Sequence, residues 1–462
     1  MRTLPFAKDR SYAVLGLARS GLSAARALHD SGAKVLAWDD NPASREKAAA
    51  AEVPVQSLES VDWQTIEGLV LSPGIPHSFP KPHPVTAAAQ AAKVPLISDI
   101  ELLARATPQV RFVGITGTNG KSTTTALIGH LLREAGAEVA VGGNLGQAVL
   151  TLPALSEKGI YVLELSSYQL ELVQSLTCSV ALLLNITSDH LDRHGGLDGY
   201  IAAKKRIFRN QGASHTAIVG VDEEPGRKIA DALEAESPAR LLRLSVERCL
   251  PGGLYLQDGW LIDDSAGKAE RLIEAASLPR LPGRHNAQNI AAAYAACRAL
   301  GFERRTLLDA LASFPGLAHR QELVAEQKGI RFVNDSKATN AEAAAKALAS
   351  YDAIYWIAGG RAKEGGLAGL EPLFPRIRHA FLIGEAQQDF ARVLAGKVTA
   401  ECCGEMATAV SAAAKAAREE GVEGAVVLLS PACASFDQYP DFEARGEAFR
   451  AAVAALSEEQ AA

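Results

Sequence analysis

The sequence predicts an α/β protein built from three domains, and three observations support that prediction. The chain has 462 residues, more than a single hydrophobic core usually serves. Short apolar runs alternate along it with segments of helical periodicity. Many of these runs end in glycine and polar residues, as parallel strands do where a sheet binds its ligand. We expect a Rossmann-like domain at residues 1–98, a central mononucleotide-binding domain with a phosphate loop at residues 99–316, and a second Rossmann-like domain at residues 317–462.

Composition and charge exclude several classes of protein. Hydrophobic residues make up 48% of the chain and charged residues 22%, as in a soluble globular protein. The net charge of −6 argues against a nucleic-acid partner, which would require a basic surface. No basic-then-apolar leader opens the chain and no uncharged run reaches about 18 residues, so we expect no membrane insertion. The six cysteines show no metal-binding spacing, and we expect reduced thiols in the cytoplasm.

The first domain opens with a strand–helix–strand pattern over residues 12–38. The turn Gly16–Gly21 resembles a dinucleotide-binding fingerprint, and Asp39 stands about 20 residues further on, as that motif requires. However, Ala18 replaces the middle glycine, and Arg19 projects from the loop. The pattern therefore leaves open both a nucleotide-like ligand and a purely structural βαβ turn.

The central domain is organised around a strand, a glycine-rich turn and a helix start at residues 110–136. In the turn Gly117–Ser122, glycines let main-chain amides surround phosphate oxygens, and the helix N-terminus adds positive partial charge. Lys121 is then placed to reach the β- and γ-phosphates, and Ser122 a magnesium ion. The strict Walker A spelling is not met, so an ordinary turn with one exposed lysine is the alternative.

Further side chains of the central domain are candidates for chemistry. Glu164 lies inside an otherwise apolar strand, where a carboxylate needs a cation; we expect a Mg²⁺ ligand, with a salt bridge at the edge of the core as the alternative. His190 follows another strand and is flanked by acids, so it is either a ligand or a structural histidine. Lys204 and Lys205 would, from their pattern alone, form a solvated helix face.

Polar residues also stand at the ends of later elements. Asn286 and Asn289 share one face of an alanine-rich helix near its N-terminus, where capping explains one asparagine and the second indicates polar recognition. In the third domain, the apolar runs at 330–334, 351–358 and 425–429 each end in polar residues. This pattern suits the binding of a small charged molecule at one edge of a sheet.

Several motifs together resemble those of the Mur ligase family. Gly117–Ser122 is similar to the loop that these ligases share with folylpolyglutamate synthase, which explains its departure from the Walker A spelling. Leu163–Gln169, Asn334–Asn340 and Leu429–Gln438, with Phe442–Gly446, resemble the branch that adds D-glutamate to UDP-N-acetylmuramoyl-L-alanine during peptidoglycan synthesis. The resemblance covers essentially the whole chain.

The resemblance implies an enzyme that uses ATP and magnesium, with two ions expected. The residues that it implies in ATP binding are Gly117, Thr118, Asn119, Gly120, Lys121, Ser122, Thr123, Asn286, Asn289, Arg320, Asp335 and Lys337. Those implied at the metal are Ser122, Glu164, His190 and Lys204; the last three, with Lys121, would be catalytic. Lys204 matches a lysine that is carbamylated in the family. Addition of CO₂ turns its ammonium group into a carboxylate-like metal ligand.

The resemblance also implies two substrate sites. The UDP-linked substrate would lie among Arg19, Ser20, Asp39, Asp40 and Asn144, although family members often have a small or apolar residue where Arg19 stands. D-Glutamate would lie among Thr339, Lys363, Ser435 and Phe442. ATP would phosphorylate the L-alanyl carboxylate to an acyl phosphate, and the amine of D-glutamate would displace phosphate.

Other functions remain as alternatives. Within the same class, the chain could be another amino-acid-adding ligase, such as a sister Mur enzyme or folylpolyglutamate synthase. From a different class, a nicotinamide-dependent dehydrogenase would use residues 16–39 and leave the phosphate loop incidental. A non-catalytic nucleotide-binding module is disfavoured by the number of charged groups at strand ends. We expect a monomer.

Overall fold

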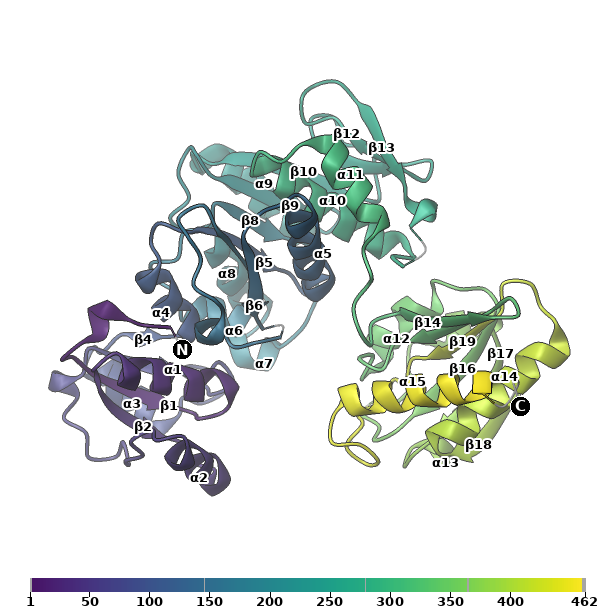
Figure 1. The fold of residues 1–462 in the computed structure, drawn as a ribbon, viewed down its shortest axis with the longest axis horizontal. Coiled ribbons are helices and arrows are strands. Elements are labelled where there is room, and N and C mark those ends of the chain that lie inside the picture. Colours follow the sequence, from purple (N-terminus) through teal and green to yellow (C-terminus); the bar gives the residue numbers. More distant parts are fainter. Residues whose placement is uncertain (1, 145, 279, 364, 459–462) are drawn as a thin grey trace. The chain divides into compact units, whose positions relative to one another are not determined.

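A computed structural model describes residues 2–144, 146–278, 280–363 and 365–458. The chain forms two compact units: the larger unit comprises residues 1–277 and 284–313, and the smaller unit comprises residues 278–283 and 314–462. Each unit is an arrangement of helices around parallel or mixed sheets, shown as ribbons in Figure 1. The α/β fold class that the sequence predicts is therefore confirmed.

The larger unit begins with a four-stranded parallel sheet. Its strands are β1 (Ser11–Leu15), β2 (Lys34–Trp38), β3 (Gly68–Leu71) and β4 (Leu96–Ile97). Their order is β2-β1-β3-β4, and Leu15 pairs with both Trp38 and Leu71. The carboxyl ends of the three longer strands therefore meet at one edge of this sheet.

A second sheet of nine strands forms the rest of the larger unit. Its strands are β5 (Arg111–Thr116), β6 (Val139–Gly143), β7 (Ile160–Glu164), β8 (Val180–Leu183), β9 (Thr216–Gly220), β10 (Arg240–Ser245), β11 (Leu254–Gln257), β12 (Trp260–Asp263) and β13 (Glu270–Glu274). Their order is β13-β12-β11-β10-β9-β8-β5-β7-β6. Because β5 lies between β7 and β8 and all three are parallel, the segments that follow these strands meet at the same edge.

The helices of the larger unit pack against these sheets. They are α1 (Arg19–Asp30), α2 (Pro42–Ala50), α3 (Pro84–Ala91), α4 (Asp99–Ala106), α5 (Lys121–Glu134), α6 (Ser167–Glu171), α7 (Leu191–His194), α8 (Leu197–Lys205), α9 (Glu224–Glu236), α10 (Arg284–Ala299) and α11 (Arg304–Ala312). Short 3₁₀ helices cover Pro5–Ala7, Trp63–Thr65, Val149–Thr151, Arg206–Phe208 and Ala275–Ser277. Helix α5 packs beside α10 and α11, which brings residues far apart in sequence together (Figure 1).

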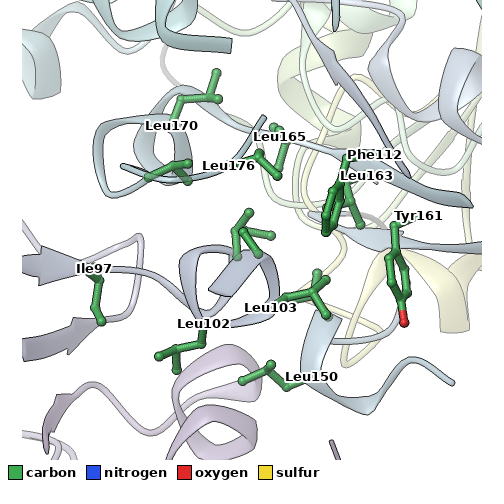
Figure 2. Close-up of a cluster of buried hydrophobic side chains, with 14 of the residues drawn as sticks. Ile97, Leu102, Leu103, Phe112, Leu150, Tyr161, Leu163, Leu165, Leu170 and Leu176 are labelled. Carbon is green, nitrogen blue, oxygen red and sulfur yellow. The ribbon is translucent and has the colours of Figure 1, made fainter. Parts of the chain in front are cut away.

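One hydrophobic core joins the two sheets of the larger unit. Figure 2 shows Ile97, Leu102 and Leu103, which lie at the end of β4 and on α4, close to side chains from the second sheet and its loops. The labelled residues of that second group are Phe112, Leu150, Tyr161, Leu163, Leu165, Leu170 and Leu176. The amide of Ser98 also donates to the carbonyl oxygen of Leu172 at 3.1 Å. Burial of this apolar surface holds the first sheet on the second.

The smaller unit contains a six-stranded sheet with helices on both faces. Its strands are β14 (Glu322–Gln327), β15 (Ile330–Asn334), β16 (Ile354–Gly359), β17 (Ile377–Ile383), β18 (Ala400–Gly404) and β19 (Val426–Leu429), in the order β14-β15-β19-β16-β17-β18. Its helices are α12 (Ala341–Leu348), α13 (Gln387–Leu394), α14 (Met406–Glu420) and α15 (Phe442–Glu458), with a 3₁₀ helix at Glu371–Arg376. Separate buried clusters lie on the two faces, so β16 and β19 are buried on both sides.

The elements agree with the sequence patterns except in one region. Residues 212–282 read as short strands and turns, and β9 to β13 do lie there, but the region also contains the 13-residue helix α9. Pro225 and Gly226, near the start of α9, are residue types typical of turns. The buried residues that follow them, Ile229, Ala230 and Leu233, have the spacing of a helix. Among the residues that the structure describes, no helix combines the length and the apolar character that a membrane crossing requires.

Candidate active site

The phosphate loop turns between β5 and α5. Gly120 adopts φ +84° and ψ −14°, a left-handed conformation that glycine enters without steric cost, and α5 begins at the next residue. The main-chain amides of Thr118 and Asn119 donate to Asn185, to its carbonyl oxygen at 2.9 Å and to its Oδ1 at 2.8 Å. Asn185 follows β8, so a neighbouring strand end fixes the conformation of the turn.

Two lysine amines meet at the carbonyl oxygen of Gly117. The Nζ of Lys121 donates to this oxygen at 3.0 Å and to the carbonyl oxygen of Thr118 at 2.8 Å. The Nζ of Lys204 donates to the same Gly117 oxygen at 2.8 Å and lies 4.6 Å from the centre of the Tyr200 ring. The loop therefore holds two amines, one from its own sequence and one from α8, the lysine that the family resemblance places at the metal.

Lys204 is buried in surroundings that disfavour its charge. Its side chain is almost fully buried, 1% exposed, near the end of α8. Burial, and then the nearby charge of Lys121, lower the pKa of Lys204 to about 6. At neutral pH this amine is therefore mostly uncharged and available as a nucleophile. The solvated helix face that the pattern alone predicts holds for Lys205, which is exposed, and is wrong for Lys204.

Glu164 ends β7 beside the phosphate loop, paired in register with Ile115 of β5. The carboxylate is 3% exposed, and its Oε1 accepts a hydrogen bond from Nδ2 of Asn144 at 3.0 Å. Its Oε2 is buried and has no hydrogen-bond partner. A buried carboxyl oxygen without a hydrogen-bond partner is costly unless another group satisfies it, so this oxygen fits a metal ligand. Asn144, which is predicted to touch the UDP-linked substrate, is therefore hydrogen-bonded to Glu164.

His190 immediately precedes α7 and has a left-handed φ of +52°. Its side chain is half-exposed, Nε2 lies 3.4 Å from Oδ2 of Asp189, and its ring lies 5.1 Å from that of Tyr168. Burial lowers the pKa of His190, which favours the neutral imidazole that binds metals. Within the described parts of the chain, no group of three or more His, Cys, Asp or Glu side chains is arranged to hold a metal ion. A cation here would need further oxygen ligands.

The N-terminal end of α10 borders the phosphate loop through its asparagines. Oδ1 of Asn289 accepts from the hydroxyl of Thr124 at 3.1 Å, and its Nδ2 donates to Oδ1 of Asn286 at 3.0 Å. A methyl group placed on Gly120 would lie 2.4 Å from Oδ1 of Asn289. The first turn of α5 also carries Ser122, which is buried, and Thr123, which is half-buried. The structure therefore brings Asn286 and Asn289 to the loop, as the sequence suggested.

Two polar contacts at the loop were not predicted from the sequence. Nδ2 of Asn185 donates to Oε1 of Gln288 at 3.1 Å, and the hydroxyl groups of Tyr200 and Thr118 lie 3.2 Å apart. Asn185 carried a local signal, because it is a polar residue directly after an apolar run. Tyr200 and Gln288 carried none, since their partners are far away in the sequence.

A cavity of about 590 Å³ lies at the strand ends of the first sheet. Its lining includes Arg19, Ser20, Asp39 and Asp40, four of the residues predicted at the UDP-linked substrate, together with residues 72–76 and His83. Asp39 is already engaged, since Oδ2 accepts the amide of Leu17 at 2.6 Å and Oδ1 that of Asn41 at 2.8 Å. The hydrogen bond from His83 lowers the pKa of Asp40. Nη1 of Arg19 donates to the carbonyl oxygen of Gly146 at 2.6 Å.

In the smaller unit, Asp335 lies after β15 and is buried. Its Oδ1 accepts the amide of Gln321 at 3.2 Å and its Oδ2 the hydroxyl of Ser430 at 2.8 Å. Burial raises the pKa of Asp335 to about 7, an effect that these hydrogen bonds and the charge of Arg320 oppose. Nζ of Lys337 lies 4.8 Å from the centre of the Phe442 ring.

The segments that follow the strands of the smaller unit are connected by hydrogen bonds to main-chain carbonyl oxygens. Buried Arg445 donates to the carbonyl oxygens of Ser336 at 2.8 Å and Cys433 at 3.0 Å, which joins the segments after β15 and β19. Arg361 and Ala434 exchange main-chain hydrogen bonds of 2.9 and 3.0 Å, which joins the segment after β16. Of the predicted D-glutamate residues, Ser435 is buried, Thr339 and Phe442 are half-buried and Lys363 is exposed on these segments.

A glycine-rich turn at a helix N-terminus, beside a buried carboxylate at the next strand end, defines an α/β protein that binds nucleotide phosphates. Residues 115–297 match the Mur ligase middle domain, and residues 319–433 match the Mur ligase glutamate ligase domain. The UDP-N-acetylmuramoylalanine–D-glutamate ligase of Rhodospirillum rubrum is 54% identical over 97% of this chain and 95% of its own. The ligase of that name from Paramagnetospirillum magneticum is 51% identical, with 100% of both chains covered. The chain therefore belongs to the Mur ligase family, and the resemblance seen in its motifs is confirmed.

Solved structures share this fold at low sequence identity. UDP-N-acetylmuramate-alanine ligase from Thermotoga maritima superposes with a TM-score of 0.56 at 16% identity, covering 97% of this chain and 99% of its own. The UDP-N-acetylmuramoylalanyl-D-glutamyl-2,6-diaminopimelate–D-alanyl-D-alanyl ligase of Acinetobacter baumannii gives 0.56 at 18% identity, covering 99% and 92%. These likenesses support the three-domain fold, whereas the domain boundaries at residues 98 and 316 and the roles of single residues stay predictions. The relatives give no support to the dehydrogenase alternative.

Proposed function

We propose that this chain is an ATP-dependent ligase that joins D-glutamate to UDP-N-acetylmuramoyl-L-alanine in the cytoplasm, a step in making the peptidoglycan precursor. The names of relatives that are 51% to 54% identical over at least 97% of the chain support this reaction. The observation that carries it is the phosphate loop, where the amines of Lys121 and Lys204 meet at the Gly117 carbonyl near the buried carboxylate of Glu164.

ATP binds at this loop through main-chain amides and Lys121. The Nζ of Lys121 donates to two loop carbonyls, so binding a phosphate exchanges neutral acceptors for anionic oxygens. Hydrogen bonds between charged groups are shorter and stronger than those to neutral acceptors, which favours this exchange. Asn286 and Asn289, already bonded to each other beside Gly120, border the adenine side.

Magnesium fits this site, although the side chains alone do not complete it. Oε2 of Glu164 lacks a partner and would hold one ion together with the hydroxyl of Ser122, while His190 would serve a second. When bound, Mg²⁺ neutralises charge on the transferring phosphoryl group. The protein supplies the buried carboxylate and the fixed loop.

Lys204 supplies the missing metal ligand after it reacts with CO₂. Its amine is mostly uncharged at pH 7, because burial lowers its pKa to about 6. The nitrogen lone pair adds to the carbon of CO₂ and one proton leaves, which gives an N-carboxylate. This modification replaces a buried amine by an anion that a metal ion can balance.

The acyl chemistry needs one activated carboxylate and one amine. The alanyl carboxylate of the UDP-linked substrate, bound at the cavity of the first sheet, attacks the γ-phosphorus of ATP and releases ADP. The amine of D-glutamate, bound in the smaller unit, then adds to the acyl carbon; phosphate leaves and the nitrogen loses a proton. Thr339, Ser435 and Lys363 provide donors for the carboxylates of D-glutamate.

A product assay tests the proposal. Purified protein receives ATP, Mg²⁺, UDP-N-acetylmuramoyl-L-alanine and an equimolar mixture of D-glutamate, L-glutamate, L-alanine, L-lysine and diaminopimelate. We expect release of phosphate and one product whose mass and chirality correspond to addition of D-glutamate. Absence of phosphate release would overturn the ligase, and addition of another amino acid would assign the chain to a sister activity.

A further inference from the structure

The loop that lines the first-sheet cavity is attached to the segment that carries His190. This β3–α3 loop, residues 72–83, contributes residues 72–76 and His83 to the cavity. Nη1 of Arg193 donates to the carbonyl oxygen of Gly74 at 2.7 Å. The ring of Phe79 packs on Gly195, so closely that an added methyl group at Gly195 would lie 2.7 Å from it. One wall of the cavity is therefore held by α7 and the residue after it.

Arg193 connects that wall to His190 through an aromatic ring. Its guanidinium carbon lies 4.8 Å from the centre of the Tyr168 ring, and that ring lies 5.1 Å from the ring of His190. Nε of Arg193 is buried and has no hydrogen-bond partner. The arginine is thus positioned by its cation–π contact with Tyr168 and by its bond to Gly74, and not by a full set of hydrogen bonds.

A second line of contacts continues to the phosphate loop. Nε2 of His77, in the β3–α3 loop, lies 3.6 Å from Glu171, which bonds Nδ1 of buried His194 at 3.0 Å. The ring of His194 lies 5.4 Å from that of Tyr200, whose hydroxyl is 3.2 Å from that of Thr118. The β3–α3 loop at the cavity and the phosphate loop therefore contact the same packed group of side chains.

We infer that Arg193 is a positioning residue that couples binding of the UDP-linked substrate to the conformation of His190 and the phosphate loop. The inference rests on the proposed function and adds to it. A ligand that orders the β3–α3 loop fixes the Gly74 carbonyl, and through Arg193 and Tyr168 it restricts His190. Coupling between binding sites is reciprocal, so ATP bound at the loop strengthens binding of the UDP-linked substrate by the same factor.

The chemistry of the side chain explains why arginine stands here. A guanidinium group is planar and carries several donors in fixed directions, so it can cover a ring with its face and donate from its edge, whereas a lysine ammonium group is a single point charge. Arg193→Lys therefore keeps the charge and a donor for Gly74 but loses the planar group that lies over Tyr168. Arg193→Ala loses both contacts. Comparing these two variants distinguishes the attachment of the β3–α3 loop from the effect of that loop on the conformation of His190.

Calorimetric titration of the full chain tests the inference. The dissociation constant of UDP-N-acetylmuramoyl-L-alanine is measured with and without a non-hydrolysable ATP analogue and Mg²⁺, and UDP alone is a second probe. Arg111→Ala is the matched control, because Arg111 also donates one bond, of 2.9 Å, to a main-chain carbonyl, that of Lys158. Melting temperature and the KM and kcat of each variant are recorded in parallel.

We expect the ATP analogue to tighten binding of the UDP-linked substrate to the wild type and to Arg111→Ala. In Arg193→Ala this tightening should disappear, and KM for the substrate should rise about tenfold, the effect of losing one charged hydrogen bond. Arg193→Lys should recover most of the KM but not the tightening, and melting temperatures should stay near that of the control. Wild-type tightening in Arg193→Ala, or none in the wild type, overturns the inference; an inactive wild type whose tightening still depends on Arg193 overturns only the proposed function.

Discussion

A single methyl group on Gly120 should damage the ATP site more than the same group at the other end of the same helix. Gly120 precedes α5 with φ +84°, and Gly136 follows the helix with φ +76°. Alanine in the left-handed region costs about 1–2 kcal/mol at either position. Around Gly136 nothing lies within 4 Å of the added atom, whereas at Gly120 it would lie 2.4 Å from Oδ1 of Asn289. The two substitutions therefore share backbone strain and differ in one collision.

The collision has a calculable consequence for Asn289. That side chain must move, and it then loses the 3.1 Å bond from Thr124 and the 3.0 Å bond to Asn286. Each buried hydrogen bond contributes about 1 kcal/mol. We expect Gly120→Ala to lower the free energy of unfolding by about 3–4 kcal/mol and Gly136→Ala by about 1–2 kcal/mol.

Binding of a non-hydrolysable ATP analogue, measured by calorimetry, decides whether the collision matters for function. Gly120→Ala should weaken binding at least about tenfold, as loss of one to two hydrogen bonds implies, whereas Gly136→Ala should bind like the wild type. Equal affinities in the two variants, with both folded at the assay temperature, would refute the placement of the adenine side at Asn286 and Asn289.

Three further outcomes are expected. Lys121→Ala removes the ammonium group from the phosphate loop and should abolish phosphate release; a near-normal kcat would contradict its role. Lys204→Ala should be inactive and should regain part of its product formation with acetate, so an unaffected variant would exclude the carbamate. Asp335→Asn keeps the bond from the Gln321 amide and can pair with Ser430 by donating to its hydroxyl, but it removes a carboxyl group whose pKa burial raises from 3.8 to about 7. Because the folded state retains that proton, wild-type stability falls as pH rises from about 4 to 7, and in urea unfolding the variant should be up to about 4 kcal/mol more stable at pH 8 and about 1.5 at pH 5. An equal difference at both pH values would show that the carboxyl group is not perturbed.

Local patterns predict the parts of this fold whose cause is local. The apolar run before Gly117 and the polar turn after it predict β5 and the start of α5, because strand burial and helix initiation depend on neighbouring residues. An acid inside an apolar strand likewise identifies Glu164 as buried. Helix α9 was missed because Pro225 and Gly226 read as a turn, although proline is tolerated in a first helical turn.

Contacts between distant segments were beyond the reach of such patterns. Lys204 and Lys205 are equivalent in composition, and only the packing of α8 against the end of β5 buries one and exposes the other. The bond from Asn144 to Glu164 depends in the same way on β6 lying next to β7. The family resemblance identified Lys204 and Glu164 for functional reasons, and it contained no information about Arg193, whose contacts are visible only in the folded chain.

The apolar core that unites the first two sheets limits how this enzyme can be recombined with its relatives. A chimera that exchanged residues 1–98 alone would separate Ile97 from Leu102 and Leu103, which belong to the same hydrophobic cluster (Figure 2). The apolar surfaces of the two joined parts would then no longer pack against each other. A graft designed to alter nucleotide-sugar preference must therefore transplant α4 and the Leu150 segment as well, or redesign their side chains to suit the incoming module.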